Sequence, residues 1–194
     1  MKRAELVWRE ILHGALETGN SVFTQIGLAG ALGISISTVN NALRPLRRMG
    51  AVRVKRRSFE VVNARKMLYY WASVRNLEQD IIYRTRIDSA VSEIEKGLPP
   101  DAVFAAYTAY KFRFKDTPAD YSEVYVYCDE KSLKELVRRL PLRKGVPNLF
   151  VLRKDFLDSR MSHANMFVDL WNLKVWYASD FVKALEARLS GILA

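Results

Sequence analysis

Within the first 62 residues, the spacing of apolar residues changes from the period of a helix to the period of a β-strand. Apolar residues recur with helical spacing in three segments, which are 4–16, 24–32 and 35–49. Thr24 and Ser35 precede the second and third segments as N-caps, and Gly33 and Gly50 follow them as helix ends. Both flanks of 51–62 alternate apolar and polar residues around a basic tip, which predicts a β-hairpin. A helix-turn-helix followed directly by such a hairpin predicts a winged helix.

The rest of the chain mixes helical and strand-like segments. Asn63 can cap a helix that extends through Val74. The elements expected after it are a strand at 81–83, a helix from Asp88 to Gly97, a partly helical segment at 102–112, a strand at 121–128, a helix at 130–140, strands at 148–152 and 165–170, and a helix capped by Ser179. This alternation predicts an α+β protein with three parts. They are a winged-helix domain (1–62), a connecting helix and linker (63–86), and a mixed α/β domain (87–194).

Positive charge is concentrated in the first half of the chain. Residues 1–86 hold 15 Lys and Arg against 6 Asp and Glu, whereas residues 87–194 hold 16 against 15. The stretch from Arg44 to Lys66 contains nine basic residues and a single acid, Glu60. A field of one sign recruits polyanions. Solvated surface charge is the simpler alternative, and a membrane surface is disfavoured because the basic residues do not lie on a strongly amphipathic free helix.

The third helical segment has two chemically different faces. Val39, Leu43, Leu46 and Met49 share one face and are expected in the core. Polar residues occupy the opposite face, where Asn can bind adenine and Arg can bind guanine with two hydrogen bonds. The expected DNA-binding residues are Ser37, Thr38, Asn40, Asn41, Arg44, Arg47 and Arg48 on the helix and Arg53, Lys55, Arg56 and Arg57 on the hairpin. The hairpin residues suit phosphate contacts, which position a protein without specifying a sequence. A solvent-facing polar surface is the alternative.

Pro45 interrupts this third segment. Proline removes one backbone donor and clashes with the preceding turn. Either the helix kinks at Pro45, or a new short helix starts there. In both cases we expect the base-contacting part of the helix to lie before Arg44.

The stretch FTQIGLAGALGISISTVNNALRPLRRMGAVRV resembles winged helix-turn-helix transcription regulators. The matching positions are Ala29, Leu32-Gly33-Ile34-Ser35, Ser37-Thr38-Val39 and Leu46 through Met49-Gly50. The resemblance covers about residues 5–62 and implies binding to double-stranded DNA.

A second stretch, VFAAYTAYKFRFKDTPADYSEVYVYC, looks like the core of the minimal nucleotidyltransferase fold. In that family a Gly-Ser pair opens a helix, and carboxylates on the next strand hold the metal that binds nucleotide phosphates. Here Ala105 and Ala106 stand where the Gly-Ser pair should be, and Glu123 and Tyr125 replace the two aspartates, although Ser122 matches. The resemblance therefore implies a domain without catalytic activity, metal or cofactor.

Together the two stretches, with an expected late strand at 168–170, resemble the antitoxin-regulators of type IV abortive-infection toxin–antitoxin systems and their archaeal relatives. That resemblance implies an autoregulatory DNA-binding protein, a toxin partner protein and a homo-oligomer, expected to be a dimer. An active nucleotidyltransferase whose winged helix presents nucleic acid is the alternative. A scaffold whose winged helix binds protein is a third possibility, which the basic helix and hairpin disfavour.

Composition excludes several other classes of protein. The 49% apolar and 27% charged residues are ordinary for a globular chain, and no apolar run approaches about 18 residues. The start MKRAELVWRE shows no export signal, so we expect a cytoplasmic protein without membrane partners. One cysteine, Cys128, excludes an internal disulfide and a cysteine-rich zinc site. With only two histidines, a structural metal site is not expected. Glutamine occurs only twice, as Gln25 and Gln79, and this low glutamine content suggests a thermophilic source.

Other residues with chemical potential have simpler explanations. We expect Cys128 to be a small core residue rather than a nucleophile. The cluster Tyr69-Tyr70-Trp71 is expected to pack in the core or between domains rather than to stack on bases. A hydrolytic or metal cluster can be drawn from His163, Asp155, Asp158 and Asp169, but the spacing fits no known ligand pattern. Packing is the simplest role for Trp171, Trp176 and Tyr177, with a dimer surface as the second choice.

Overall fold

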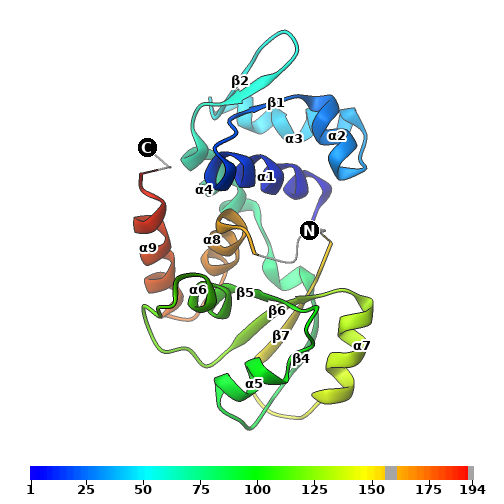
Figure 1. Cartoon of the computed structure of the whole chain (residues 1–194), viewed down its shortest axis with the longest axis vertical. Helices are drawn as coiled ribbons and strands as arrows, with labels where there is room; N and C mark the ends of the chain where they lie inside the picture. The colour runs from blue at the N-terminus through cyan, green and yellow to red at the C-terminus, as the bar shows by residue number, and fades with distance from the viewer. Residues whose placement is uncertain (156–160, 192–194) are drawn as a thin grey trace. The chain divides into compact units, whose positions relative to one another are not determined.

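The computed structural model describes residues 1–155 and 161–191 as an α+β protein with two small sheets (Figure 1). These residues form two compact units. Unit 1 comprises Met1–Arg75, Ser162–Val168 and the described residues from Leu185 onward. Unit 2 comprises the described part of Asn76–Met161 and Asp169–Ala184. These limits do not coincide with the domain boundaries expected at residues 62 and 86.

Unit 1 begins with the helices that the sequence predicts. They are α1 (Arg3–His13), extended by the π-helical turn η1 (Gly14–Thr18), then α2 (Gln25–Leu32) and α3 (Ile36–Arg48). The hydroxyl of Thr24 accepts a hydrogen bond from the Gly27 N–H at 2.9 Å, and that of Ser35 accepts one from the Thr38 N–H at 3.2 Å. Gly33 ends α2 with a left-handed φ of 62°. Both expected N-caps and the expected helix end are thus confirmed.

The predicted hairpin is also present in unit 1. Strands β2 (Val52–Val54) and β3 (Phe59–Val61) pair antiparallel, and the short strand β1 (Val22–Phe23) pairs with the other edge of β3. The sheet order is therefore β1-β3-β2. Helix α4 (Ala64–Val74) follows, capped by the side chain of Asn63 as expected.

The apolar face of α3 lies in the core of unit 1. Val39, Leu43 and Leu46 have no exposed surface. The indole N–H of Trp8 on α1 donates to the carbonyl of Ala42 at 2.8 Å. Because α3 is one continuous helix with Pro45 inside it, the alternative in which a new helix starts at Pro45 is wrong. Packing of the buried face compensates the hydrogen bond that proline cannot make.

A buried carboxylate links α1 to α4. Glu5 is 3% exposed, and its Oε2 accepts hydrogen bonds from the Trp71 indole and from the Arg75 guanidinium, both at 3.1 Å. Trp71 is fully buried, so the expected core position is confirmed for this residue of the Tyr69-Tyr70-Trp71 cluster. Tyr70 is half-buried, and its ring packs edge-on against Trp8. The hydroxyl of Tyr69 donates to Glu186.

Unit 2 is built on a four-stranded sheet of order β4-β7-β6-β5, in which only the β6–β7 pair is parallel. Its elements are η2 (Leu77–Asp80), β4 (Ile81–Thr85), α5 (Val91–Gly97), β5 (Val103–Ala105), α6 (Ala106–Phe114), β6 (Val124–Cys128), α7 (Glu130–Arg139) and β7 (Leu149–Arg153). Two more helices, α8 (His163–Trp171) and α9 (Ala178–Leu189), contribute residues to both units.

Strand β6 carries two kinds of side chain on its two faces. Val124, Val126 and Cys128 belong to the apolar cluster that contains Leu136 of α7. The alternate residues are Tyr125, whose ring stacks on Phe150 at 4.7 Å, and Tyr127, whose hydroxyl donates to Asp169. This period of two is why the sequence identifies the strand correctly, although it begins at Val124 rather than at 121.

Residues 165–170 are not a strand, as the sequence suggested, but part of helix α8. Every residue from Ala164 to Leu170 is buried. A segment buried on all sides shows no helical period, so its apolar run resembles a buried strand. The expected strand at 168–170 is wrong for the same reason.

Two expected caps are also wrong. Helix α5 begins at Val91 after Ala90, with no side-chain cap, and Asp88 instead pairs with Arg86. Helix α9 begins at Ala178, so Ser179 lies in its first turn, where its hydroxyl donates to the Trp176 carbonyl.

Within the described ranges, no single helix has the length and apolar character needed to cross a membrane. Helices α2 and α3 meet the criterion only when taken together, and the chain direction changes by 119° between them.

Candidate nucleic-acid interface

The polar face of α3 is accessible. Ser37, Asn40, Asn41, Arg44 and Arg48 are exposed. The guanidinium of Arg44 donates to Oδ1 of Asn41 at 3.0 Å. This contact orients both side chains on the outer surface of the helix and leaves the Asn41 amide N–H groups and most of the Arg44 donors available.

Three of the expected helix residues are more constrained. The Ser35 hydroxyl that caps α3 lies 2.8 Å from the hydroxyls of both Ser37 and Thr38. Thr38 is half-buried, and Arg47 is half-buried with its Nε buried and without a hydrogen-bond partner among the described residues. The hydroxyls at the start of α3 thus already take part in the cap, and Arg47 is the least accessible of the expected arginines.

The hairpin exposes its basic residues. Arg53, Lys55, Arg56 and Arg57 are all exposed. Lys55 pairs with Glu60 at 2.8 Å. The hydrogen bond from Lys55 and its positive charge hold the pKa of Glu60 below its usual value. Arg56 and Arg57 form no ion pair with any residue of 1–155 or 161–191. These two guanidinium groups therefore lack an acidic partner in the part of the chain that the structure describes.

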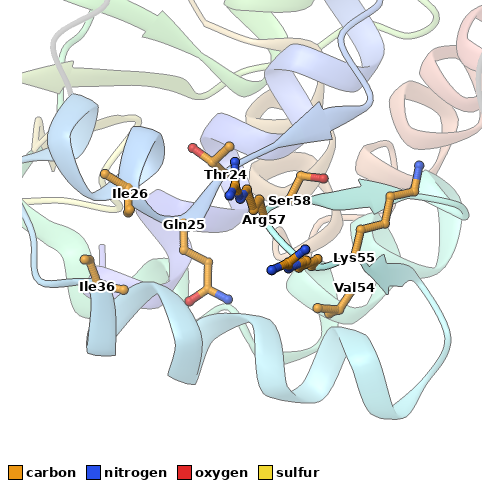
Figure 2. A pocket seen from close by; sticks show the side chains of 9 residues that line it. Thr24, Gln25, Ile26, Ile36, Val54, Lys55, Arg57 and Ser58 are labelled. Carbon is orange, nitrogen blue, oxygen red and sulfur yellow. The ribbon is translucent and has the colours of Figure 1, made fainter.

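A groove of about 750 Å³ separates the hairpin from the N-terminal ends of α2 and α3 (Figure 2). It is lined by Thr24, Gln25, Ile26, Ile36, Val54, Lys55, Arg56, Arg57 and Ser58. Figure 2 shows Ile26, Gln25 and Ile36 on the helix side and Val54, Lys55 and Arg57 on the hairpin side.

The structure thus brings three expected hairpin residues close to the start of α3. The apolar side chains that line this groove were not among the site residues expected from the sequence. One feature could have indicated them. Ile26 and Ile36 lie in the first turns of their helices, at positions that do not belong to the row of buried residues.

The positions matched to the nucleotidyltransferase core lie in unit 2. Ala105 ends β5, and Ala106 opens α6 with a left-handed φ of 47°, a conformation that favours glycine. Burial raises the pKa of Glu123, although the Tyr177 hydroxyl donates to its Oε2 at 3.0 Å and opposes the shift. Burial also raises the pKa of Tyr125, which keeps this residue neutral. These residues do not form the pair of carboxylates that a catalytic metal needs.

Two tyrosines beside Glu123 were not identified as site residues from the sequence. Tyr177 contacts both Ser122 and Glu123 through its hydroxyl. The ring of Tyr107 packs against that of Tyr177 at 5.2 Å, and its buried hydroxyl has no hydrogen-bond partner among the described residues. Tyrosines separated by 70 positions in sequence give no local pattern that would reveal this cluster.

The other chemical candidates have structural roles or are exposed. Asp169 is fully buried and accepts the Tyr127 hydroxyl at 3.0 Å, and the backbone N–H of His163 donates to Glu17. Asp158 lies outside the described residues. No group of three His, Cys, Asp or Glu within those residues could hold a metal ion.

Cys128 is 1% exposed, and burial raises the pKa of its thiol to about 12, so it is a core residue as expected. Trp171 and Trp176 are 45% and 77% exposed, so packing does not account for these two side chains, and a dimer surface stays a prediction.

Comparison of the chain with protein-family models, with curated proteins and with solved structures finds no match in any of the three.

Proposed function

We propose that the protein is a sequence-specific regulator of transcription that binds double-stranded DNA through a winged helix-turn-helix formed by α2, α3 and the β2–β3 hairpin. The single observation that carries the proposal is the composition of this surface. An exposed face of α3 bearing Asn40, Asn41 and Arg44 is followed in the same unit by a hairpin whose four basic residues are all exposed.

The two elements have chemically distinct tasks in this proposal. Asn and Arg on α3 can form paired hydrogen bonds with base edges in the major groove, which is wide enough to admit a helix. Arg56 and Arg57 on the hairpin bind phosphates. Their guanidinium groups have no acidic partner among the described residues, so they can bind DNA without breaking an internal ion pair. Each phosphate contact releases counterions from the DNA, which favours binding.

The resemblance to antitoxin-regulators extends the proposal. The DNA would be the promoter of the protein's own operon, and the protein would act as a homodimer with a toxin partner. The exposed Trp171 and Trp176 are candidates for the protein contacts, because exposed tryptophans are enriched at interfaces. Unit 2 would have a regulatory or contact role without nucleotidyl transfer, because only Glu123 is acidic at the matched positions.

Salt titration of duplex binding tests the proposal. About four to six phosphate contacts predict a slope of roughly −4 to −5 in a plot of log affinity against log salt. Arg56→Ala or Arg57→Ala should weaken binding to all sequences alike and reduce that slope by about one. Arg138→Ala, an exposed arginine on α7 in unit 2, is the matched control and should change neither. Absence of duplex binding at low salt would refute the proposal.

Base recognition is tested on α3. Asn41→Ala or Arg44→Ala should reduce discrimination between the preferred and mismatched sites by about 1–3 kcal/mol. Because Arg44 and Asn41 are hydrogen-bonded to each other, the double variant should lose less than the sum of the single variants. If hairpin variants changed the sequence preference and α3 variants did not, the two roles would be reversed.

A further inference from the structure

Three aliphatic side chains in the groove between the hairpin and α3 are exposed to solvent. Ile26 is 72% exposed, Ile36 is 49% exposed and Val54 is 48% exposed. Single exposed aliphatic residues are common on protein surfaces and need no explanation. Here, however, three of them line one concavity together with Lys55, Arg56 and Arg57 (Figure 2). Such a groove suits a partner that combines dense negative charge with a small apolar group.

Duplex DNA fits this description. Its phosphates complement the basic side of the groove, and the major groove presents one prominent apolar group, the C5 methyl of thymine. An acidic peptide could satisfy the charge, but it would leave the polar face of α3 without a role. A contact between this apolar surface and a thymine methyl group rests on the DNA binding proposed above and adds one feature of the recognised sequence.

Ile36 has the position that this contact requires. It is the first residue of α3, and it lies one helical turn before Asn40, which lies one turn before Arg44. Residues spaced by four lie in one row along a helix, and the N-terminal part of a recognition helix contacts base edges. The neighbouring hydroxyls of Ser37 and Thr38 are engaged with the capping hydroxyl of Ser35. The exposed apolar surface at this end of α3 is therefore that of Ile36.

We propose that Ile36 is a specificity-determining residue that contacts a thymine methyl group in the major groove, next to the base contacted by Asn40. Ile26 and Val54 line the same groove and add apolar surface without selecting a base. Because thymine carries a C5 methyl group that cytosine and uracil lack, this contact selects thymine over both bases at the same position.

Deoxyuridine substitution tests the proposal directly, because uracil differs from thymine only by the methyl group. The preferred duplex is first selected with the full-length protein from a randomised library, and each thymine is then replaced singly by deoxyuridine. We expect one position, or two adjacent ones, at which the replacement lowers affinity about four-fold, the effect of removing one buried methyl-sized group. Replacements elsewhere should leave the affinity unchanged.

Two variants separate Ile36 from its neighbours. Ile36→Ala should bind the thymine and uracil duplexes equally at the sensitive position, because the methyl group has lost its partner. Ile26→Ala, a matched change of another exposed groove residue, should keep the four-fold difference. Far-UV circular dichroism of both variants should match that of the parent protein, since neither side chain is buried.

The outcomes distinguish this proposal from the function on which it rests. Duplex binding with no uracil-sensitive position, or an Ile36→Ala variant that keeps the difference, would overturn the role of Ile36 and leave DNA binding intact. Failure of the library to yield any bound duplex would refute DNA binding itself, and the role of Ile36 with it.

Discussion

At the scale of single residues, the surroundings of Glu123 disfavour the charged form of its carboxyl group. Burial raises its pKa, and the hydrogen bond from Tyr177 offsets only part of that shift. In a metal-dependent transferase, a carboxylate at this position would be stabilised by a cation that it holds together with a second carboxylate. Here the side-chain partner of Glu123 among the described residues is the hydroxyl of Tyr177, which in turn contacts the hydroxyl of Ser122. The residue is better suited to a partly buried hydrogen-bonding role than to metal binding.

This environment predicts how Glu123→Gln changes stability with pH. The pKa of this carboxyl is about 4.3 in an unfolded chain and higher in the folded protein, so the folded protein binds more protons between these two values. The contribution of the carboxyl to stability therefore falls as the pH rises from the unfolded pKa through the folded pKa. Glutamine has no such dependence and still accepts the Tyr177 hydrogen bond. The variant should therefore equal the parent in urea unfolding below pH 4 and exceed it at pH 7.

Tyr177→Phe is the matched variant. It removes the donor that favours the charged carboxylate, so it should lower the free energy of unfolding at pH 7, by about 1–3 kcal/mol, with a smaller loss below pH 4. A Glu123→Gln variant that is less stable than the parent at neutral pH would contradict the assignment, because it would show that the charge is used.

At the scale of elements, the start of α3 depends on one side chain. The Ser35 hydroxyl accepts the Thr38 N–H and contacts the hydroxyls of Ser37 and Thr38. Ser35→Ala removes the side-chain acceptor and leaves the Thr38 N–H only the Ser35 carbonyl at 3.0 Å, so it should cost about 1 kcal/mol in urea unfolding. Ser37→Ala removes a hydroxyl that caps no backbone group, so it should cost much less. Equal losses in the two variants would show that the cap does not stabilise the helix.

The caps show why some elements could be predicted from sequence and others could not. Thr24, Ser35 and Asn63 act on backbone groups three residues away, so their effect is encoded locally. Helix α8 has a cap of the same kind, because the Ser162 hydroxyl accepts the Asn165 N–H at 3.2 Å. The residues from Ala164 to Leu170, however, are all buried, and their pattern matches either a helix or a strand. Its form depends on neighbours distant in sequence, such as Arg9, whose Nε donates to Asn165 at 3.1 Å.

The candidate interface follows the same rule. The basic residues of the hairpin and the polar face of α3 could be identified from sequence because each lies within one element. The groove that contains Ile26, Ile36 and Val54 combines residues from the starts of two helices with the hairpin. Its existence depends on how α2, α3 and the hairpin are folded together, which no local pattern expresses.

At the scale of the whole molecule, the two units are not continuous segments of the chain. Residues 162–168 and the described residues from Leu185 onward belong to unit 1, although the sheet of unit 2 precedes them in sequence. Within unit 1 the ring of Phe167 packs against that of Tyr69 at 5.3 Å, and Glu186 pairs with Arg65 at 2.6 Å. The sequence suggested a self-contained domain ending near residue 62, because hydrophobic periods show where elements lie but not which distant segments complete a core.

This arrangement predicts that residues 1–62 do not fold alone. Glu5 is 3% exposed, and the two side chains that donate to its Oε2, Trp71 and Arg75, both lie beyond residue 62. Only the Lys2 backbone N–H, which donates to Oε1 at 3.3 Å, lies within the first 62 residues among its described donors. A buried charge that loses its partners costs about 3–5 kcal/mol, a large share of the roughly 5–15 kcal/mol that stabilises a domain. The buried Met67 and Leu68 of α4 would also be missing from the core.

Two fragments test this expectation by circular dichroism and urea unfolding. Fragment 1–62 should show no cooperative transition. Fragment 1–75 restores α4 and both side-chain donors to Glu5, so it should regain helical signal and a transition, though at lower urea than the full chain because Asn165 and Phe167 are missing. Cooperative unfolding of fragment 1–62 would show that Glu5 is tolerated without its partners and that the DNA-binding part ends at the hairpin. If only fragment 1–75 unfolds cooperatively, α4 is an integral part of the DNA-binding unit rather than a linker, because the charge it neutralises lies in α1.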